Sequence, residues 1–112
     1  MKIVEKPWGR EIWVARTDKY ALKIIDIRQG TRSSLQYHVH KHEHIYLEAG
    51  LLELEWENDR GEMEVHTLRP GDVIEVKPGR KHRARAVEEV RLLEVSTPEL
   101  DDVVRVEDDY RR

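Results

Sequence analysis

Two short segments of the chain carry the residues that could bind a metal ion. They read Gly30-x5-Gln36-x-His38-x4-Glu43-x6-Gly50 and Gly71-x6-Pro78-Gly79-x2-His82. Each combines glycine turns with strand-like residues, and neither has enough ligands to fill a coordination sphere alone. Brought together inside a barrel, they would supply one amide oxygen, two imidazoles and one carboxylate. Cysteine is absent, so any metal must be held by nitrogen and oxygen.

The composition predicts one globular domain over residues 1–112. Charged residues make up 38% of the chain, yet the net charge is only −3, so both signs cover the surface. No basic stripe points to a nucleic acid, and no apolar run is long enough to span a membrane. The N-terminus lacks a secretory signal pattern, so we expect a cytoplasmic protein.

The hydrophobic pattern has a period of two, which is typical of half-buried β-strands. Residues 52–57 and 62–67 alternate on either side of a turn, so they are predicted to form a hairpin. Further strands are expected at residues 11–15, 20–28 and 73–76, and residues 82–87 and 90–95 are expected to pair with each other. No stretch before residue 97 has a helical stripe, so the sequence predicts an all-β sandwich or barrel.

Strand alternation places the candidate ligands on particular faces. Around the first segment, Gln36, His38 and His40 would share one inward face. Glu43 and His44 would point in opposite directions, and the apolar residues that alternate with Glu43 favour it as the inward one. His82 would share its face with small residues that leave a cavity, while Arg83 and Arg85 would lie on a solvated face.

The two segments resemble the motifs of the cupins, usually Gly-x5-His-x-His-x3-4-Glu-x6-Gly and Gly-x5-Pro-x-Gly-x2-His. The first motif matches at every spacing, with Gln36 in place of the first histidine, and the second matches with its proline moved to Pro78. The resemblance implies a double-stranded β-helix with Gln36, His38, Glu43 and His82 as metal ligands. His40 could replace Gln36 or lie behind the ligands, and the ion could be Zn²⁺, Mn²⁺ or Fe²⁺.

The ends of the chain sharpen this resemblance. The segment Glu5-Lys6-Pro7-Trp8-Gly9 and the acidic tail over residues 101–110 are similar to the cupin domain of type II mannose-6-phosphate isomerases. In that family the domain often follows a sugar-nucleotide transferase domain. The resemblance implies a metal-dependent isomerase that acts on a small sugar phosphate, with His40 or an unliganded carboxylate as proton carrier.

Further expectations accompany this function. Phosphate would need a cationic rim, for which the candidates are Arg32, Lys23, Arg80, Lys81 and Arg105. Apolar strand surface and the residues around Ile3 and Val4 predict a homodimer. Two other classes stay open: a dioxygenase with mononuclear iron or manganese, and a non-catalytic module that binds a sugar or another ligand.

Overall fold

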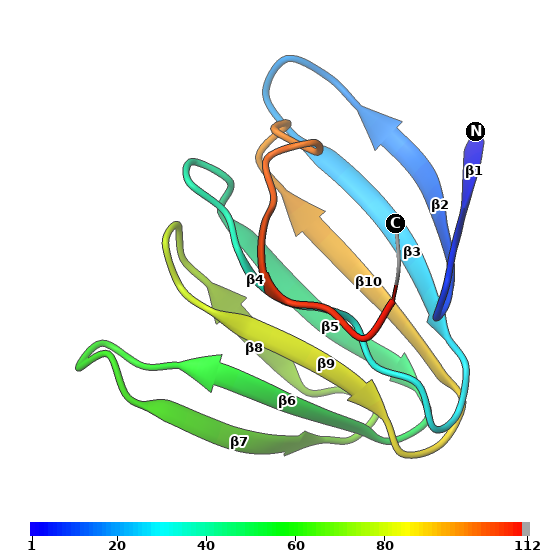
Figure 1. Cartoon of the computed structure of the whole chain (residues 1–112). Helices are drawn as coiled ribbons and strands as arrows, with labels where there is room; N and C mark the ends of the chain where they lie inside the picture. The colour runs from blue at the N-terminus through cyan, green and yellow to red at the C-terminus, as the bar shows by residue number, and fades with distance from the viewer. Residues whose placement is uncertain (111–112) are drawn as a thin grey trace.

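The protein folds into two antiparallel β-sheets that face each other (Figure 1). The computed structural model describes residues 1–110. Within them every regular element is a strand: β1 (Lys2–Lys6), β2 (Gly9–Arg16), β3 (Ala21–Ile27), β4 (Leu35–Tyr37), β5 (Glu43–Ala49), β6 (Leu52–Glu57), β7 (Met63–Leu68), β8 (Val73–Val76), β9 (His82–Ala86), β10 (Val90–Ser96) and β11 (Val104–Glu107). The all-β prediction is confirmed. No helix in this part of the chain is long and apolar enough to cross a membrane.

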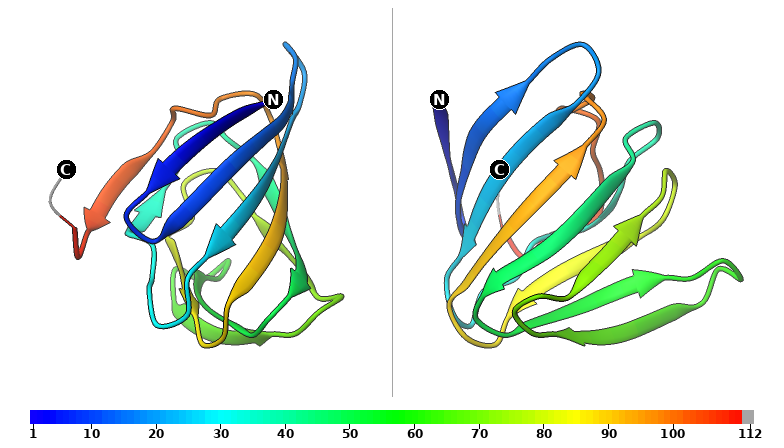
Figure 2. Two further views of the ribbon diagram at one scale, coloured as in Figure 1. Left: turned by 90° about the vertical axis from the view of Figure 1, so that its right-hand side faces the viewer. Right: turned by 180° about the vertical axis from the view of Figure 1, so that it is seen from behind.

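Strands from distant parts of the chain alternate in both sheets. The six-stranded sheet has the order β1-β2-β3-β10-β5-β8, and the five-stranded sheet has the order β11-β4-β9-β6-β7. The views in Figure 2 show the sheets curving toward each other and enclosing the interior between them. Because the two segments with metal-ligating residues supply β4, β5 and β9, this topology brings them to one interior.

Several predicted elements are confirmed and one predicted pairing is wrong. The β6–β7 hairpin forms with Leu52 opposite Leu68, and β8 has the expected bounds. Strands β9 and β10, however, do not pair with each other. β9 lies between β4 and β6, whereas β10 lies between β3 and β5. The turn near Glu88 therefore carries the chain from one sheet to the other, a step that periodicity alone does not reveal.

The core lies between the sheets and follows the strand alternation. In β3, for example, Ala21, Lys23, Ile25 and Ile27 are buried and the residues between them are not. The other buried apolar residues include Leu47, Leu52, Leu54, Val76, Val90 and Leu92. Lys23 is an exception to the apolar character of this inward face.

The C-terminal segment docks as a strand. β11 pairs with β4, with Arg105 opposite Gln36. It covers Arg83, whose Nε donates to the Ser33 carbonyl and whose Nη2 donates to the Glu107 carbonyl. Arg83 is consequently 4% exposed, so its prediction as part of a solvated face is wrong, while Arg85 is exposed as expected.

Candidate metal centre

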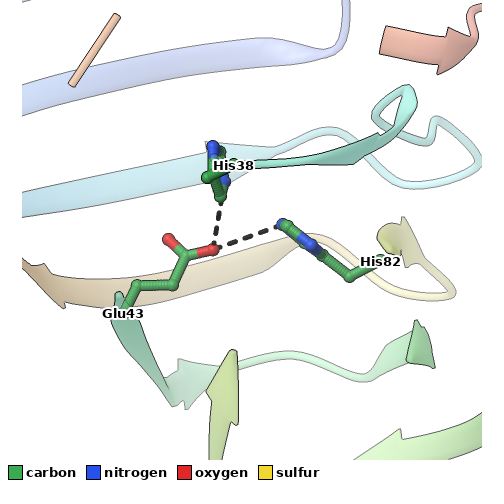
Figure 3. A group of neighbouring side chains, drawn as sticks. All are labelled: His38, Glu43 and His82. Carbon is green, nitrogen blue, oxygen red and sulfur yellow. Dashed lines mark ion pairs between the residues drawn. The ribbon is translucent and has the colours of Figure 1, made fainter. Parts of the chain in front are cut away.

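Three side chains from different elements meet inside the barrel (Figure 3). Glu43 opens β5, His82 opens β9, and His38 follows the end of β4. The Oε1 atom of Glu43 lies 3.4 Å from His38 Nε2 and 3.2 Å from His82 Nε2. Their potential ligand atoms all lie within 4.8 Å of one another, and all three side chains are buried. This group could hold a metal ion.

The second nitrogen of each imidazole sets the ring's tautomer. His38 Nδ1 donates to the Asp102 carbonyl, and His82 Nδ1 donates to the Arg80 carbonyl at 3.1 Å. A carbonyl oxygen only accepts hydrogen bonds, so Nδ1 of each ring carries a proton and the Nε2 atom of each ring is the one that faces Glu43. Backbone carbonyls behind the ring are the usual way in which proteins orient metal-binding histidines.

The centre contains buried polar atoms that lack a hydrogen-bond partner. Within the described residues His38 Nε2 and both carboxylate oxygens of Glu43 are buried without a hydrogen-bond partner. Unpaired buried acceptors are costly, and a cation bound among them would offset that cost. Two imidazole nitrogens and a carboxylate suit Zn²⁺, Mn²⁺ or Fe²⁺. The donor set therefore fits a divalent ion.

Asp102, from the C-terminal segment, holds the loop that carries His38. Its carboxylate accepts three backbone N–H bonds, from Val39 at 3.0 Å, His40 at 2.7 Å and Lys41 at 3.0 Å. Those N–H groups, the one from His40 foremost, keep the pKa of Asp102 below its usual value. Since the Asp102 carbonyl also accepts from His38, one residue fixes both the loop and the ring.

Two buried ionisable residues, Lys41 and Glu94, border the centre. The sequence pattern did not indicate either of them as part of the site. Lys41 Nζ lies 3.3 Å from Glu43 Oε2 and donates to Glu94 Oε2 at 3.1 Å. Burial alone would lower the pKa of Lys41, but the carboxylates of Glu94 and Glu43 raise it above its usual value. Burial, with the charge of Glu43 next in importance, raises the pKa of Glu94 to about 8. Lys41 is therefore a cation, and Glu94 holds a proton at neutral pH.

The pKa of Glu43 moves in the opposite direction. Burial alone would raise it, but the polar groups around the carboxyl, Glu94 first and Lys41 among them, hold it well below its usual value. Glu43 is therefore a carboxylate, the form that binds a cation.

The remaining predicted site residues lie in different places. Gln36 is half-buried beside the centre, opposite His82 in the β4–β9 pair, and its Oε1 accepts from the Ser34 hydroxyl at 2.8 Å. Its role as a ligand stays a prediction. His40 is exposed, so the prediction that it shares an inward face with Gln36 and His38 is wrong. The reason is that β4 ends at Tyr37, so strand alternation does not extend to His40.

A cavity of about 230 Å³ opens beside the centre. Lys23, Lys41 and Glu94 line it together with the three metal-binding candidates. Among the five cations expected to bind phosphate, only Lys23 and Arg105 belong to this lining. The other three are elsewhere: Arg32 pairs with Asp109, Arg80 pairs with Asp59, and Lys81 is exposed. Lys6, which the sequence analysis did not single out as a phosphate ligand, also lines the cavity.

One signal in the sequence could have identified the inward charges. Lys23 alternates with the apolar Ile25 and Ile27, and Glu94 alternates with Leu92 and Val90. A charged residue in register with an apolar face is a candidate for the interior. For Lys41 the signal was absent, because it lies in a loop.

Comparison with known proteins agrees with this geometry. Residues 1–108 match the model of the family described as mannose-6-phosphate isomerase C-terminal. The xanthan biosynthesis protein XanB of Xanthomonas campestris pv. campestris is 32% identical over 114 residues, which cover 97% of this chain and 23% of that protein. The chain thus spans about a quarter of the length of this curated relative.

Solved structures share the fold at low sequence identity. KdgF from Halomonas sp. superposes with a TM-score of 0.79 at 21% identity, covering 90% of this chain and 91% of that chain. A conserved Klebsiella pneumoniae protein with a double-stranded β-helix domain gives 0.77 at 20% identity, covering 94% and 90%. Oxalate decarboxylase from Bacillus subtilis gives 0.80 at 18% identity, covering 94% of this chain and 30% of that chain.

These likenesses confirm the double-stranded β-helix of the cupins. Together with the match along nearly the whole chain, they show that the protein belongs to the mannose-6-phosphate isomerase C-terminal family of cupin domains.

Proposed function

We propose that the protein is a metal-dependent isomerase that interconverts the aldose and ketose forms of a sugar phosphate. One observation carries the proposal: buried, unpaired acceptors on His38 and Glu43 converge with His82 in a chain of this family. A bound divalent ion would act as a Lewis acid toward adjacent sugar oxygens. His38, Glu43 and His82 would hold it, and the Nδ1 hydrogen bonds described above keep the Nε2 atom of each ring directed inward.

The chain's own residues supply the other needs of this chemistry. Proton transfer between adjacent carbons requires a group that can hold and release a proton near the metal. Glu94 lines the cavity, is not part of the metal group, and lies next to Lys41 at 3.1 Å. It takes the role of the unliganded carboxylate that the sequence analysis left unassigned. Lys6 and Arg105, the more exposed cations of the lining, could bind the phosphate.

Metal content is the first test. Untagged protein prepared without chelators should contain one equivalent of zinc, manganese or iron by mass spectrometry, and the His38→Ala, His82→Ala double variant should contain none. The Mn(II) centres named for Bacillus subtilis oxalate decarboxylase support including manganese in the assay. The loaded protein should interconvert mannose 6-phosphate and fructose 6-phosphate. Metal binding without interconversion would contradict the substrate assignment, and oxygen uptake would favour a dioxygenase instead.

We also propose that the protein is a homodimer. The outward face of the six-stranded sheet carries an apolar row in which neighbouring residues are register partners: Ile3, Ile12, Ile24, Leu93, Tyr46 and Val73. Ile3 is 56% exposed and Val73 is 57% exposed, so the row reaches solvent at both sheet edges. In a two-fold symmetric dimer, this row would pack against the same row of the partner subunit, and the contact would remove its apolar side chains from water. Light scattering should give a dimer at micromolar concentration and a monomer for Leu93→Glu; a wild-type monomer would contradict the proposal.

A further inference from the structure

A row of acidic and basic side chains, alternating along its length, runs through the interior from the candidate metal centre to the opposite side of the cavity. Its members lie on β2, β3, β10, the loop after β4, and β5: Glu11, Lys23, Glu94, Lys41 and Glu43. The nitrogen and oxygen atoms of successive members are 3.0, 3.9, 3.1 and 3.3 Å apart. Each of the five residues is at most 9% exposed.

A metal ion accounts for only one end of this row. Glu43 would bind the ion, and Lys41 pairs with the Glu43 carboxylate at 3.3 Å. Glu11 and Lys23 are further along the row, on strands whose inward positions otherwise carry apolar residues such as Ile25 and Ile27. Removing ions from water is costly, and an apolar pair often fills such a position equally well or better. The Glu11–Lys23 pair therefore calls for an explanation beyond folding.

The Glu11–Lys23 pair is hydrogen-bonded but keeps unused hydrogen-bonding capacity. Glu11 Oε1 accepts from Trp13 Nε1 and from Lys23 Nζ, both at 3.0 Å. Within the described residues no donor reaches Glu11 Oε2, and Lys23 Nζ makes a single hydrogen bond although an ammonium has three protons. Both side chains line the cavity. They thus present a charged acceptor next to a charged donor.

An acceptor beside a donor matches the hydroxyl group, which donates one hydrogen bond and accepts others. A ligand with hydroxyls on adjacent carbons could use one hydroxyl for the carboxylate and the next for the ammonium. Hydrogen bonds to charged groups are stronger than those between neutral groups. Burial opposes ionisation of Glu11, but Lys23 and then the Trp13 N–H lower its pKa below the usual value, so it stays an acceptor.

We propose that Glu11 and Lys23, held in place by Trp13, form a hydroxyl-binding subsite for a polyhydroxylated ligand whose reacting end lies at His38, Glu43 and His82. This inference rests on the proposed function for the position of the reacting end. It adds the residues that would select the hydroxyl groups of a linear polyol or open-chain sugar. Glu11 and Lys23 act as specificity-determining residues and take no part in the proton transfer.

Calorimetry on the metal-loaded protein tests the subsite by binding alone. The ligands are mannose 6-phosphate, the neutral polyol mannitol, and inorganic phosphate, which carries no carbon-bound hydroxyl. Glu11→Gln and Lys23→Met should each weaken mannose 6-phosphate and mannitol by about tenfold or more, because each loses a hydrogen bond to a charged group. Binding of inorganic phosphate and the metal content should not change. Glu53→Gln, on the outer face of the five-stranded sheet, is the matched control and should behave as the wild type.

Binding and turnover, measured separately, distinguish a failure of this inference from a failure of the proposed function. Wild-type protein that binds mannose 6-phosphate without converting it, with binding lost in the variants, would refute the isomerase and retain the subsite. Unchanged polyol affinity in both variants would refute the subsite, as would a wild type that binds neither mannose 6-phosphate nor mannitol. If a single variant fails to fold, the Glu11→Leu, Lys23→Met double variant replaces the pair with apolar residues and leaves the same prediction.

Discussion

The two ends of the cavity bury charge in opposite ways. At the Glu11 end, the carboxylate has an ammonium and an indole N–H within 3.0 Å. At the Glu43 end, two imidazole Nε2 atoms and the Lys41 ammonium at 3.3 Å face the carboxylate, yet neither of its oxygens has a hydrogen-bond partner among residues 1–110. The Glu11 carboxylate is thus hydrogen-bonded by the protein's own side chains, whereas the Glu43 carboxylate is left with acceptor atoms that a bound cation would pair.

The largest effect should follow a change at the unsatisfied end. Glu43→Gln should weaken divalent metal binding by about 100-fold or more, since loss of a ligand exceeds the 10–100-fold typical of residues behind the ligands. The metal-free variant should melt lower than the metal-free wild type, because the neutral amide does not replace the carboxylate that pairs with Lys41 at 3.3 Å. Metal titration and thermal melts in chelator measure the two quantities. A variant that binds metal normally would overturn the comparison.

A smaller loss should follow when the ligand loop is released. Asp102→Asn keeps the carbonyl that orients His38 but replaces one of the two carboxylate oxygens with an NH₂ group, so the backbone N–H groups of residues 39–41 lose acceptors. We expect about tenfold weaker metal binding. Asp109→Asn, which removes the tail's ion pair with Arg32 outside the cavity, is the control and should leave metal affinity unchanged. Equal losses of metal affinity in the two variants would mean that metal binding depends on the docking of the whole tail and not on Asp102 in particular.

The free energy of unfolding of the metal-free protein should depend on pH through Glu94, the residue in the middle of the row. The pKa of Glu94 rises from 4.5 to about 8 on folding, so between those values the folded chain holds a proton that the unfolded chain has released. The free energy of unfolding should therefore fall as pH rises from 5 to 8, by up to about 1.4 kcal/mol per pH unit. Urea unfolding in chelator measures this slope, and Glu94→Gln should flatten it. A wild-type stability that rises across this window would be the contrary result.

The smallest effect should come from charges outside the barrel. Asp26 accepts from Arg10 at 2.9 Å and from Arg91 at 2.8 and 3.0 Å on the outward face of the six-stranded sheet. Asp26→Asn should lower the free energy of unfolding by less than about 1 kcal/mol, because solvent screens such pairs. Metal affinity should not change. A larger loss in the free energy of unfolding, measured with denaturant, would show that these surface ion pairs contribute as much to stability as buried ones.

The sequence predicted the fold and the three converging ligand candidates because their signals are local. Alternation and turn residues defined most strands, and the inward orientation of Glu43 followed from Ile45 and Leu47 beside it. It did not predict the position of His40, because the end of a three-residue strand depends on pairing with β9 and β11. Nor did it identify the partnership of Glu94 with Lys41. Their positions are 53 residues apart, and only the sheet order brings them together.

The strand order also bears on how the chain folds during synthesis. In the six-stranded sheet β10 lies between β3 and β5, and in the five-stranded sheet β9 lies between β4 and β6. Both strands come from the last third of the chain, so ribosome-bound fragments that end before residue 82 lack the partners of the strand edges that β9 and β10 later cover, on β3, β4, β5 and β6. Such long-range pairing slows folding and exposes edges that can associate. We expect nascent chains of this protein to stay open until β9 and β10 emerge and join the two halves of each sheet, and β11 to dock on β4 last.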